Sequence, residues 1–320
     1  ENSITGFRGS HFPSGSQMKD YGSITIDPQA GTLKNTADAR ATLMVINKNS
    51  PDYFTCTLKD NFDVVVELTA TMHSGFFRLT YLGSSSAYVL IDAHPGGNTE
   101  LHASENEIWA KNMQHGYSDG TPENAKIVGY SVVRFNRSFL PSSGENGYIA
   151  HADFSVDNGE NISVKVGTSF ISYEQARANL NNEISDWDFD RVRNETRAEW
   201  NRELGKIEVE GENERQMTIF YSALYHCMLV PRVFSENGRY YSVFDGENHT
   251  CSGYQFYDDF SLWDTFRAEH PLLTIIQPAR VEDMCQSLVD MYEQGDWMPK
   301  WPNPGYSSVC LLYTSDAADE

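Results

Sequence analysis

The segment ISVKVGTSFISYEQARANLNNE, residues 162–183, contains the change of pattern that decides the fold. As far as Ile171, apolar and polar residues largely alternate, which is the period of a half-buried β-strand. Beyond Ser172 the chain becomes charged and helix-prone, and apolar residues recur at helical spacing at Ala176, Leu180, Ile184 and Trp187. The sequence therefore predicts a change from β to α structure near Ser172.

The residues before this change predict a series of short strands separated by turn-rich segments such as Pro95–Asn98 and Ser142–Gly147. The predicted strands cover residues 23–26, 41–46, 54–58, 64–71, 76–82, 88–92, 127–135, 148–156 and 162–171. Because no helices separate them, they favour a large antiparallel sandwich over a parallel sheet.

The residues after the change predict helices with a break near Asp188. Asp186–Asp190 alternates carboxylates but lacks the Gly and the distal Glu of an EF-hand, so it is interpreted as a helix junction. Further helices are predicted at residues 213–228, 260–276 and 278–294, with a kink or restart at Pro271. The apolar face predicted for the last helix comprises Val281, Met284, Cys285, Leu288 and Tyr292, which places the Cys285 thiol in the interior.

Composition and charge restrict the classes of partner. Asp and Glu number 45 against 24 Lys and Arg, a net charge of -21, which argues against nucleic acid and anionic membrane surfaces. No run of about 18 apolar residues is present, so no membrane insertion is predicted. The five cysteines form no CxxC pair, which argues against a structural zinc site.

The densest chemistry lies in Tyr257–Arg267, where carboxylates, a Trp and a guanidinium are close in sequence. Helical spacing would let Asp264 and Arg267 project near one rim, and a carboxylate beside an Arg binds sugar hydroxyls well. The alternative is an ordinary helix N-terminus capped by Asp258 or Asp259, with Arg267 in a surface ion pair. Spacing alone favours this alternative.

Two other segments stand out. Trp297–Pro302 places two Trp residues around Lys and Pro, which suits either the rim of a saccharide cleft or a hydrophobic loop at the end of a helical barrel. The glycine-rich loop Gly6–Ser16 lacks the phosphate-loop pattern and its strand–helix context, which argues against a nucleotide site.

At these residues the sequence resembles a known family. Phe260–Leu273, FSLWDTFRAEHPLL, and Tyr292–Pro302, YEQGDWMPKWP, are similar to signatures of the family 92 glycoside hydrolases. Supporting similarities, in chain order through Val309, are Gly6–His11, Asp20–Gly22, Val166–Ser172 and Phe220–His226. The resemblance favours the functional interpretation of the Asp264 segment over the helix-cap alternative.

The resemblance implies a multi-domain β + α fold: an N-terminal antiparallel β-sandwich, a helical linker and an (α/α)6 barrel. The expected domains are an N-terminally incomplete sandwich at residues 1–172, a linker at 173–211 and the first part of the catalytic barrel at 212–309. Residues 310–320 resemble a translated sequencing adapter and are interpreted as a non-native tail. The chain is thus expected to be truncated at both ends.

The resemblance also implies an activity. Members of the family are calcium-dependent exo-α-mannosidases that invert the anomeric centre, so the expected cofactor is Ca²⁺ and the expected partner a mannose-containing oligosaccharide or glycoprotein glycan. The expected location is secreted, periplasmic or at the cell surface. By similarity Asp264 would hydrogen-bond the terminal mannose, and His11 would reach over from the sandwich. The pocket would be shaped by Trp263, Arg267, Lys300 and Trp301.

The carry-over from the family has limits. The family's catalytic Glu and Asp are expected past the end of this chain, so no catalytic acid, base or calcium ligand is assigned, and the fragment itself is expected to be inactive and poorly soluble. Pro13–Gln17 lacks the aromatic residue that many members carry there, so linkage preference is not carried over. The alternatives are a non-catalytic carbohydrate-binding protein and an (α/α)6 hydrolase of another sugar.

Overall fold

The computed structural model describes residues 3–9, 21–59, 63–83, 85–113, 127–143, 147–211, 213–296, 298, 299 and 302, without the side chains of Ser85, Ser143 and Trp263. These residues form two compact units. The first comprises the described residues up to Arg202 except Ile127, and the second comprises Ile127 and the described residues from Glu203 onward.

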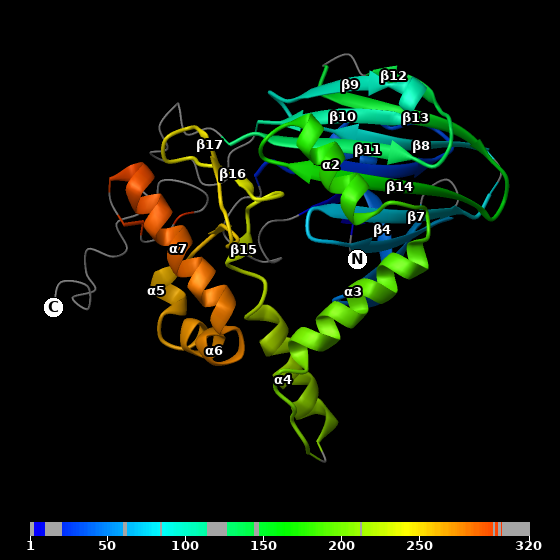
Figure 1. Ribbon diagram of the computed structural model, residues 1–320. Coiled ribbons are helices and arrows are strands. Elements are labelled where there is room, and N and C mark those ends of the chain that lie inside the picture. The colour runs from blue at the N-terminus through cyan, green and yellow to red at the C-terminus, as the bar shows by residue number, and fades with distance from the viewer. Residues whose placement is uncertain are drawn as a thin grey trace. The chain divides into compact units, whose positions relative to one another are not determined.

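The first unit is built on two antiparallel sheets (Figure 1). The nine-stranded sheet contains, in spatial order, β1 (Ser3–Ile4), β4 (Thr42–Ser50), β5 (Tyr53–Lys59), β6 (Asp63–Ala70), β7 (Ser74–Tyr81), β14 (Glu160–Ser169), β11 (Gly129–Phe135), β10 (Glu107–Asn112) and β9 (Asn98–His102). The five-stranded sheet contains β12 (Leu140–Ser143), β13 (Ile149–Val156), β8 (Ser85–Asp92), β3 (Thr25–Ala30) and β2 (Phe7–Arg8). One-turn helices α1 (Ala37–Arg40) and η1 (Ala103–Glu105) lie in the connections. The predicted antiparallel sandwich is confirmed.

The hydrophobic core of this unit draws on both sheets. Val64 and Val66 on β6 of the nine-stranded sheet and Val89 and Ile91 on β8 of the five-stranded sheet belong to one cluster, and all four are fully buried. Their spacing of two residues along each strand puts every apolar residue of the series on the same face. The alternation that predicts the strands is therefore also the pattern that builds the core.

Helix α2 (Tyr173–Glu183) covers part of the outer face of the nine-stranded sheet, lying across β11 and β14 (Figure 1). It begins at Ser172, whose hydroxyl accepts a hydrogen bond from the backbone N–H of Gln175 at 3.1 Å. Its buried residues include Ala176 and Leu180, which join Phe76 of the sheet in a second hydrophobic cluster. The change from β to α structure predicted near Ser172 is confirmed.

The predicted break near Asp188 is also confirmed, because α3 (Phe189–Leu204) starts one residue later. Trp187, the last residue of the predicted stripe, lies in the junction and is 38% exposed. Lys165 of β14 holds this junction: its ammonium donates to the Ile184 carbonyl at 3.0 Å and lies 4.1 Å from the Trp187 ring centroid. Burial, and then the charge of Arg134, lower the pKa of Lys165 to about 8.

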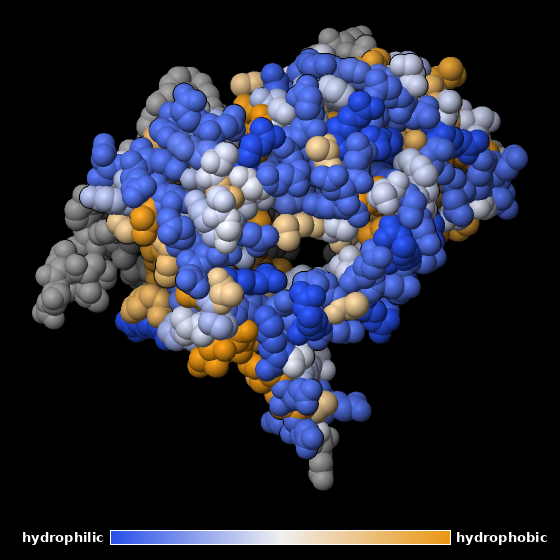
Figure 2. Space-filling model, viewed as in Figure 1, coloured by the Kyte–Doolittle hydropathy of each residue, from blue (hydrophilic) through white to orange (hydrophobic). Residues whose placement is uncertain are grey.

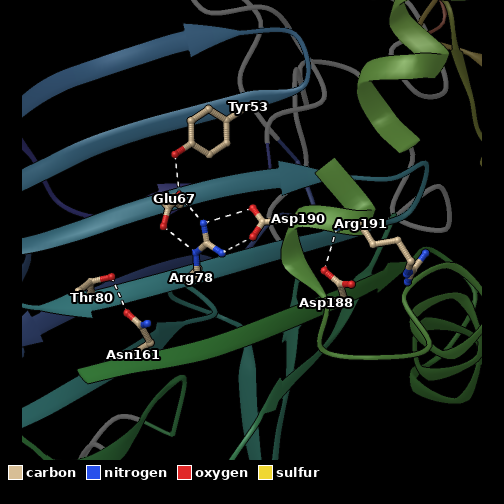
Figure 3. Close-up of polar contacts among 8 residues, drawn as sticks. All are labelled: Tyr53, Glu67, Arg78, Thr80, Asn161, Asp188, Asp190 and Arg191. Atoms are coloured by element: carbon tan, nitrogen blue, oxygen red, sulfur yellow. Dashed lines mark hydrogen bonds and ion pairs between the residues drawn. The ribbon is translucent and has the colours of Figure 1, made fainter. Parts of the chain in front are cut away.

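A polar network fixes the start of α3 on strands β5 to β7 (Figure 3). The Arg78 guanidinium donates two hydrogen bonds to Glu67, at 2.7 and 2.8 Å, and two to Asp190 of α3, at 3.0 and 3.4 Å. The Tyr53 hydroxyl donates to the same Glu67 carboxylate at 2.6 Å. The guanidinium also lies 4.5 Å from the Phe189 ring centroid. Bidentate pairing and the cation–π contact together fix the orientation of the arginine.

The second unit is mainly helical. Its helices are α4 (Glu214–His226), α5 (Leu262–Thr265), α6 (Glu269–Ile276) and α7 (Pro278–Gly295). Two short antiparallel pairs lie between α4 and α5: β15 (Arg232–Val233) with β18 (Tyr257–Asp258), and β16 (Arg239–Tyr241) with β17 (Asn248–Thr250). The helices predicted at 213–228 and 278–294 are confirmed, and the helix predicted at 260–276 restarts at Glu269, two residues before Pro271.

The buried face of α7 differs from the prediction. Met284 and Met291 are buried together with Ser287 and Asp290, whereas Cys285 is exposed. The polar pair points inward because it has partners there: the Ser287 hydroxyl accepts from the Tyr257 N–H at 2.9 Å, and Asp290 accepts from the Tyr254 hydroxyl. The prediction of a buried Cys285 thiol was therefore wrong, because Ser287 and Asp290, which have hydrogen-bond partners, take the buried face of the helix instead.

Large apolar side chains are exposed on the helices of the second unit, including Ile219 of α4 at 58% and Ile275 of α6 at 78%. Figure 2 shows hydrophobic surface gathered over α6. The described residues form no closed barrel; they are a β part followed by a helical part, as the sequence predicts. The boundaries at 172, 211 and 309 stay predictions, and residue 309 and the tail 310–320 lie outside the described residues.

Candidate functional site

The segment around Asp264 starts from the short strand pair β15–β18. Arg232 of β15 lies opposite Asp258 of β18, and Asp259 follows at once in the left-handed region with φ of 65°. Both aspartates are 2% exposed, and the Arg232 guanidinium forms an ion pair with the Asp259 carboxylate. A buried arginine–carboxylate pair thus anchors the chain immediately before the segment that carries Asp264.

Asp258 is held differently from its neighbour. Its carboxyl accepts a hydrogen bond from the Asp259 N–H at 2.7 Å. Burial, and then the negative charge of Asp259, hold the pKa of Asp258 well above its usual range. Neither aspartate caps a helix, because the N-cap of α5 is Ser261. The capping role considered for Asp258 and Asp259 is therefore wrong, and their carboxyls brace the turn instead.

Asp264 lies in the single turn of α5, where the Ser261 hydroxyl donates to one of its oxygens. Its side chain is exposed. Arg267 follows α5 and is also exposed; its guanidinium lies 5.3 Å from the Phe266 ring centroid and makes no ion pair with Asp264. The carboxylate and the guanidinium are therefore both open to a ligand.

Glu269, the first residue of α6, is the residue that sequence reasoning did not single out. One of its carboxyl oxygens is buried without a hydrogen-bond partner among the described residues. Burial, and then the charge of Asp264, raise the pKa of Glu269 to about 7. Burial, and then the charge of Glu269, raise the pKa of Cys227, which follows α4. Glu269 thus interacts electrostatically with Asp264 and, separately, with Cys227.

This arrangement suits a neutral ligand with hydroxyl groups. The exposed Asp264 carboxylate accepts hydrogen bonds, whereas Glu269 near neutral pH can either donate or accept one. His270, beside Glu269, has its pKa lowered by burial and so adds no positive charge near neutral pH. The only sequence signal for Glu269 is an acidic residue at the start of an otherwise apolar helix.

The structure places the other predicted site residues only in part. Trp263 belongs to α5, but its side chain is not described. His11, Lys300 and Trp301 lie outside the described residues, so their approach to Asp264 stays a prediction. Within the described ranges, no group of three or more His, Cys, Asp or Glu side chains could hold a metal ion. No calcium ligand is therefore assigned among these residues.

Comparison with known proteins gives the family. The model of the glycosyl hydrolase family 92 N-terminal domain matches residues 1–169, and that of the family 92 catalytic domain matches residues 175–317. The chain belongs to glycosyl hydrolase family 92. The family 92 boundary falls at the change from β to α structure, between residues 169 and 175.

Solved structures of family 92 proteins share this fold. The inverting mannosidase BT2199 of Bacteroides thetaiotaomicron is 31% identical, with a TM-score of 0.87 over 96% of this chain and 43% of its own. The α-mannosidase BT3965 of the same organism has a TM-score of 0.77 at 24% identity, over 87% of this chain and 42% of its own. At this identity the comparison shows that the fold is shared. The chain thus spans less than half the length of these family 92 structures.

One further relative matches over a shorter part of the chain. A protein described as an uncharacterized secreted glycosidase of Arthroderma benhamiae is 32% identical over 112 residues, which are 33% of this chain and 13% of that protein. The family 92 chain is therefore related to glycosidases, and mannosidases are among its structural neighbours.

Proposed function

We propose that the protein carrying this chain removes terminal α-linked mannose from glycans, with inversion of the anomeric centre and assistance from calcium. The observation that carries the proposal is the similarity to BT2199, a family 92 inverting mannosidase, at 31% identity over 96% of the chain. Family membership by itself supports glycoside hydrolysis.

Asp264 is proposed to bind the terminal mannose. Its exposed carboxylate, held by the Ser261 hydroxyl, can accept hydrogen bonds from sugar hydroxyls, and such charge-assisted bonds are the strong ones. Arg267 is proposed to donate to the same sugar or its neighbour. Trp263, Lys300, Trp301 and His11 are proposed, by the family resemblance, to shape the pocket.

Inverting hydrolysis needs two further carboxyl groups. One protonates the leaving oxygen and the other activates a water, about 6.5–9.5 Å away on the opposite face of the sugar. Neither role is assigned to a residue of this chain. Calcium, a cation that prefers oxygen ligands, is part of the proposal through the resemblance alone, and no step is derived through it. The expectation that the 320-residue chain by itself is inactive stays a prediction.

The proposed substrate is a mannose-containing oligosaccharide or a glycoprotein glycan, such as an N-glycan undergoing degradation. A neutral glycan suits a protein with a net charge of -21, which repels polyanions. Export is proposed too, supported by the word "secreted" in the description of the Arthroderma benhamiae relative. No helix among the described residues is long and apolar enough to cross a membrane.

The test compares the complete gene product with its Asp264→Asn variant on α-linked mannobioses. Asparagine keeps the size of the side chain but removes the charge, so kcat/KM should fall roughly 10- to 150-fold, as for a lost hydrogen bond to a charged group. The matched control is Asp38→Asn at an exposed carboxylate of α1, which should change nothing. An equal loss in both variants would overturn the role of Asp264.

The same assay separates the alternatives. Calcium-dependent binding of mannose without turnover by the complete, folded protein would favour a non-catalytic carbohydrate-binding protein. Release of glucose from α-glucosides, with mannosides untouched, would favour an (α/α)6 hydrolase of another sugar.

A further inference from the structure

An aromatic surface lies on the outer face of the nine-stranded sheet, next to its β9 edge. Along β10, Ile108 and Ala110 are fully buried in the core between the sheets. The alternating residues Glu107, Trp109 and Lys111 therefore face outward. This is the face on which α2 covers β11 and β14 (Figure 1).

Aromatic rings from four elements meet there. Across the β9–β10 register, Glu100 lies opposite Trp109, and the His102 ring stacks on the Trp109 ring with centroids 4.1 Å apart. Tyr173, the first residue of α2, lies 5.1 Å from Trp109 between ring centroids, and Tyr130 of β11 meets Tyr173 edge-on at 5.1 Å. We call His102, Trp109, Tyr130 and Tyr173 the aromatic surface.

The rings of the aromatic surface are held in place. The Trp109 indole N–H donates to Glu107 at 2.7 Å, and Glu107 is fully buried and also bonded by the Arg134 guanidinium. The Tyr173 hydroxyl is buried and has no hydrogen-bond partner among the described residues. A fixed ring loses little freedom when it binds a ligand, which favours affinity.

The docking of α2 accounts for only part of the aromatic surface: Trp109 packs against the cluster that fixes the helix and Tyr173 belongs to the helix, whereas His102 and Glu100 lie outside that cluster. The helix is fixed through Ala176 and Leu180, in a cluster with Phe76 of the sheet. The aromatic rings are only partly buried; the His102 side chain, at the end of the stack, is 31% exposed, and Glu100 beside it is 45% exposed. The surface thus combines open ring area with an exposed carboxylate.

We propose that the aromatic surface is a saccharide-binding site of the sandwich, separate in its residues from the Asp264 segment. Ring faces stack on the C–H faces of a pyranose, while the Glu100 carboxylate accepts hydrogen bonds from its hydroxyls. A neutral oligosaccharide suits this surface better than an anionic oligosaccharide, because an anionic ligand would be repelled by the exposed carboxylate. The choice of a mannose oligosaccharide as the ligand rests on the proposed function. The inference that the surface binds a saccharide rests instead on its own aromatic rings and carboxylate.

The test measures binding of α-mannotriose, and of cellotriose for comparison, by isothermal titration calorimetry. It uses the complete gene product in an Asp264→Asn background with a calcium chelator, because the substitution alone only slows the proposed hydrolysis. Trp109→Ala should weaken binding by roughly fivefold or more, the loss expected for one stacked ring. His102→Ala, at the exposed end of the stack, should weaken it as well and guards against misfolding of the tryptophan variant. Trp187→Ala, at a tryptophan 38% exposed in the junction between α2 and α3, is the matched control and should bind as the parent does.

The outcomes separate this proposal from the proposed function. Binding of α-mannotriose that both the Trp109 and His102 variants lose supports the aromatic surface, whether or not the parent protein hydrolyses mannosides. Binding of cellotriose alone, lost in the same variants, would keep the saccharide site and overturn the choice of mannose. Affinity unchanged in both variants, or no binding of either trisaccharide, would overturn the site.

Discussion

Glu269→Gln tests the electrostatics of the candidate site most simply. The substitution keeps the shape of the side chain and removes its titration. Burial and the charge of Asp264 raise the pKa of Glu269 from 4.5 to about 7. The folded protein therefore keeps a proton that the unfolded chain releases between these pH values, so the free energy of unfolding falls as pH rises through this window.

The size of the effect follows from the shift. At about 1.36 kcal/mol per unit of pKa, a change from 4.5 to about 7 sets an upper limit of about 3.4 kcal/mol. Glu269 is partly exposed and Asp264 is exposed, so solvent screening reduces this to roughly 1–3 kcal/mol. The free energy of unfolding of the wild type, relative to Glu269→Gln, should drop by this amount between pH 4.5 and about 8.

Urea denaturation followed by tryptophan fluorescence measures this difference. Glu282→Gln, at an exposed position of α7, is the control and should show no such pH dependence. Asp264→Asn should shift the drop to lower pH, because it removes the second cause of the raised pKa of Glu269. If the difference in free energy of unfolding between the wild type and Glu269→Gln stays constant across this pH range, the reasoning is refuted.

Three further substitutions test how the helices are held on the sandwich, each by urea denaturation. Gly167→Ala should lower the free energy of unfolding by roughly 1–3 kcal/mol, because its Cβ would lie 2.2 Å from the Ala176 carbonyl oxygen of α2. Gly211→Ala, whose Cβ would have nothing within 4 Å, should lower it far less, and equal losses would contradict the close approach of α2 to β14. Arg78→Met should lower the free energy of unfolding by roughly 2–4 kcal/mol, because it leaves Glu67 without its ion pair. Asp190→Asn should lower it by less than about 1 kcal/mol, because the Asp190 side chain is itself 62% exposed; the reverse order would contradict the network. Lys165, whose pKa burial lowers to about 8 in the folded protein, keeps its proton up to about pH 10.5 in the unfolded chain. The free energy of unfolding of the wild type, relative to Lys165→Met, should therefore rise between these pH values. A fall would contradict the burial of the amine.

The fold could be predicted where the pattern is local. Alternation along β6 and the helical spacing of Ala176 and Leu180 each depend on a few neighbouring residues, and the structure confirms both elements. Strand β10 was not predicted because Glu107 makes it look polar, and ion pairs with the distant Arg134 and Arg177 explain why a carboxylate is buried there. The short strands β15 to β18 were missed because a strand of two or three residues carries no period.

The candidate site could be predicted only as a stretch of sequence. Asp264 and Arg267 stand in a continuous motif, so a single sequence is sufficient to identify them. The raised pKa of Glu269 depends on burial and on the charge of Asp264, and these follow from how α5 and α6 fold together. The inward face of α7 likewise depended on Tyr257, a partner 30 residues before Ser287.

The central claim is the hydrolysis of terminal α-linked mannose, and the anomer of the released sugar tests it most directly. The complete gene product is incubated with α-linked mannobioses in calcium, with a chelator control, and proton NMR follows the first product. The account predicts β-mannose at early times and no release with the chelator. Release of α-mannose, or no release from any α-linked mannobiose by the folded protein in calcium, would contradict it.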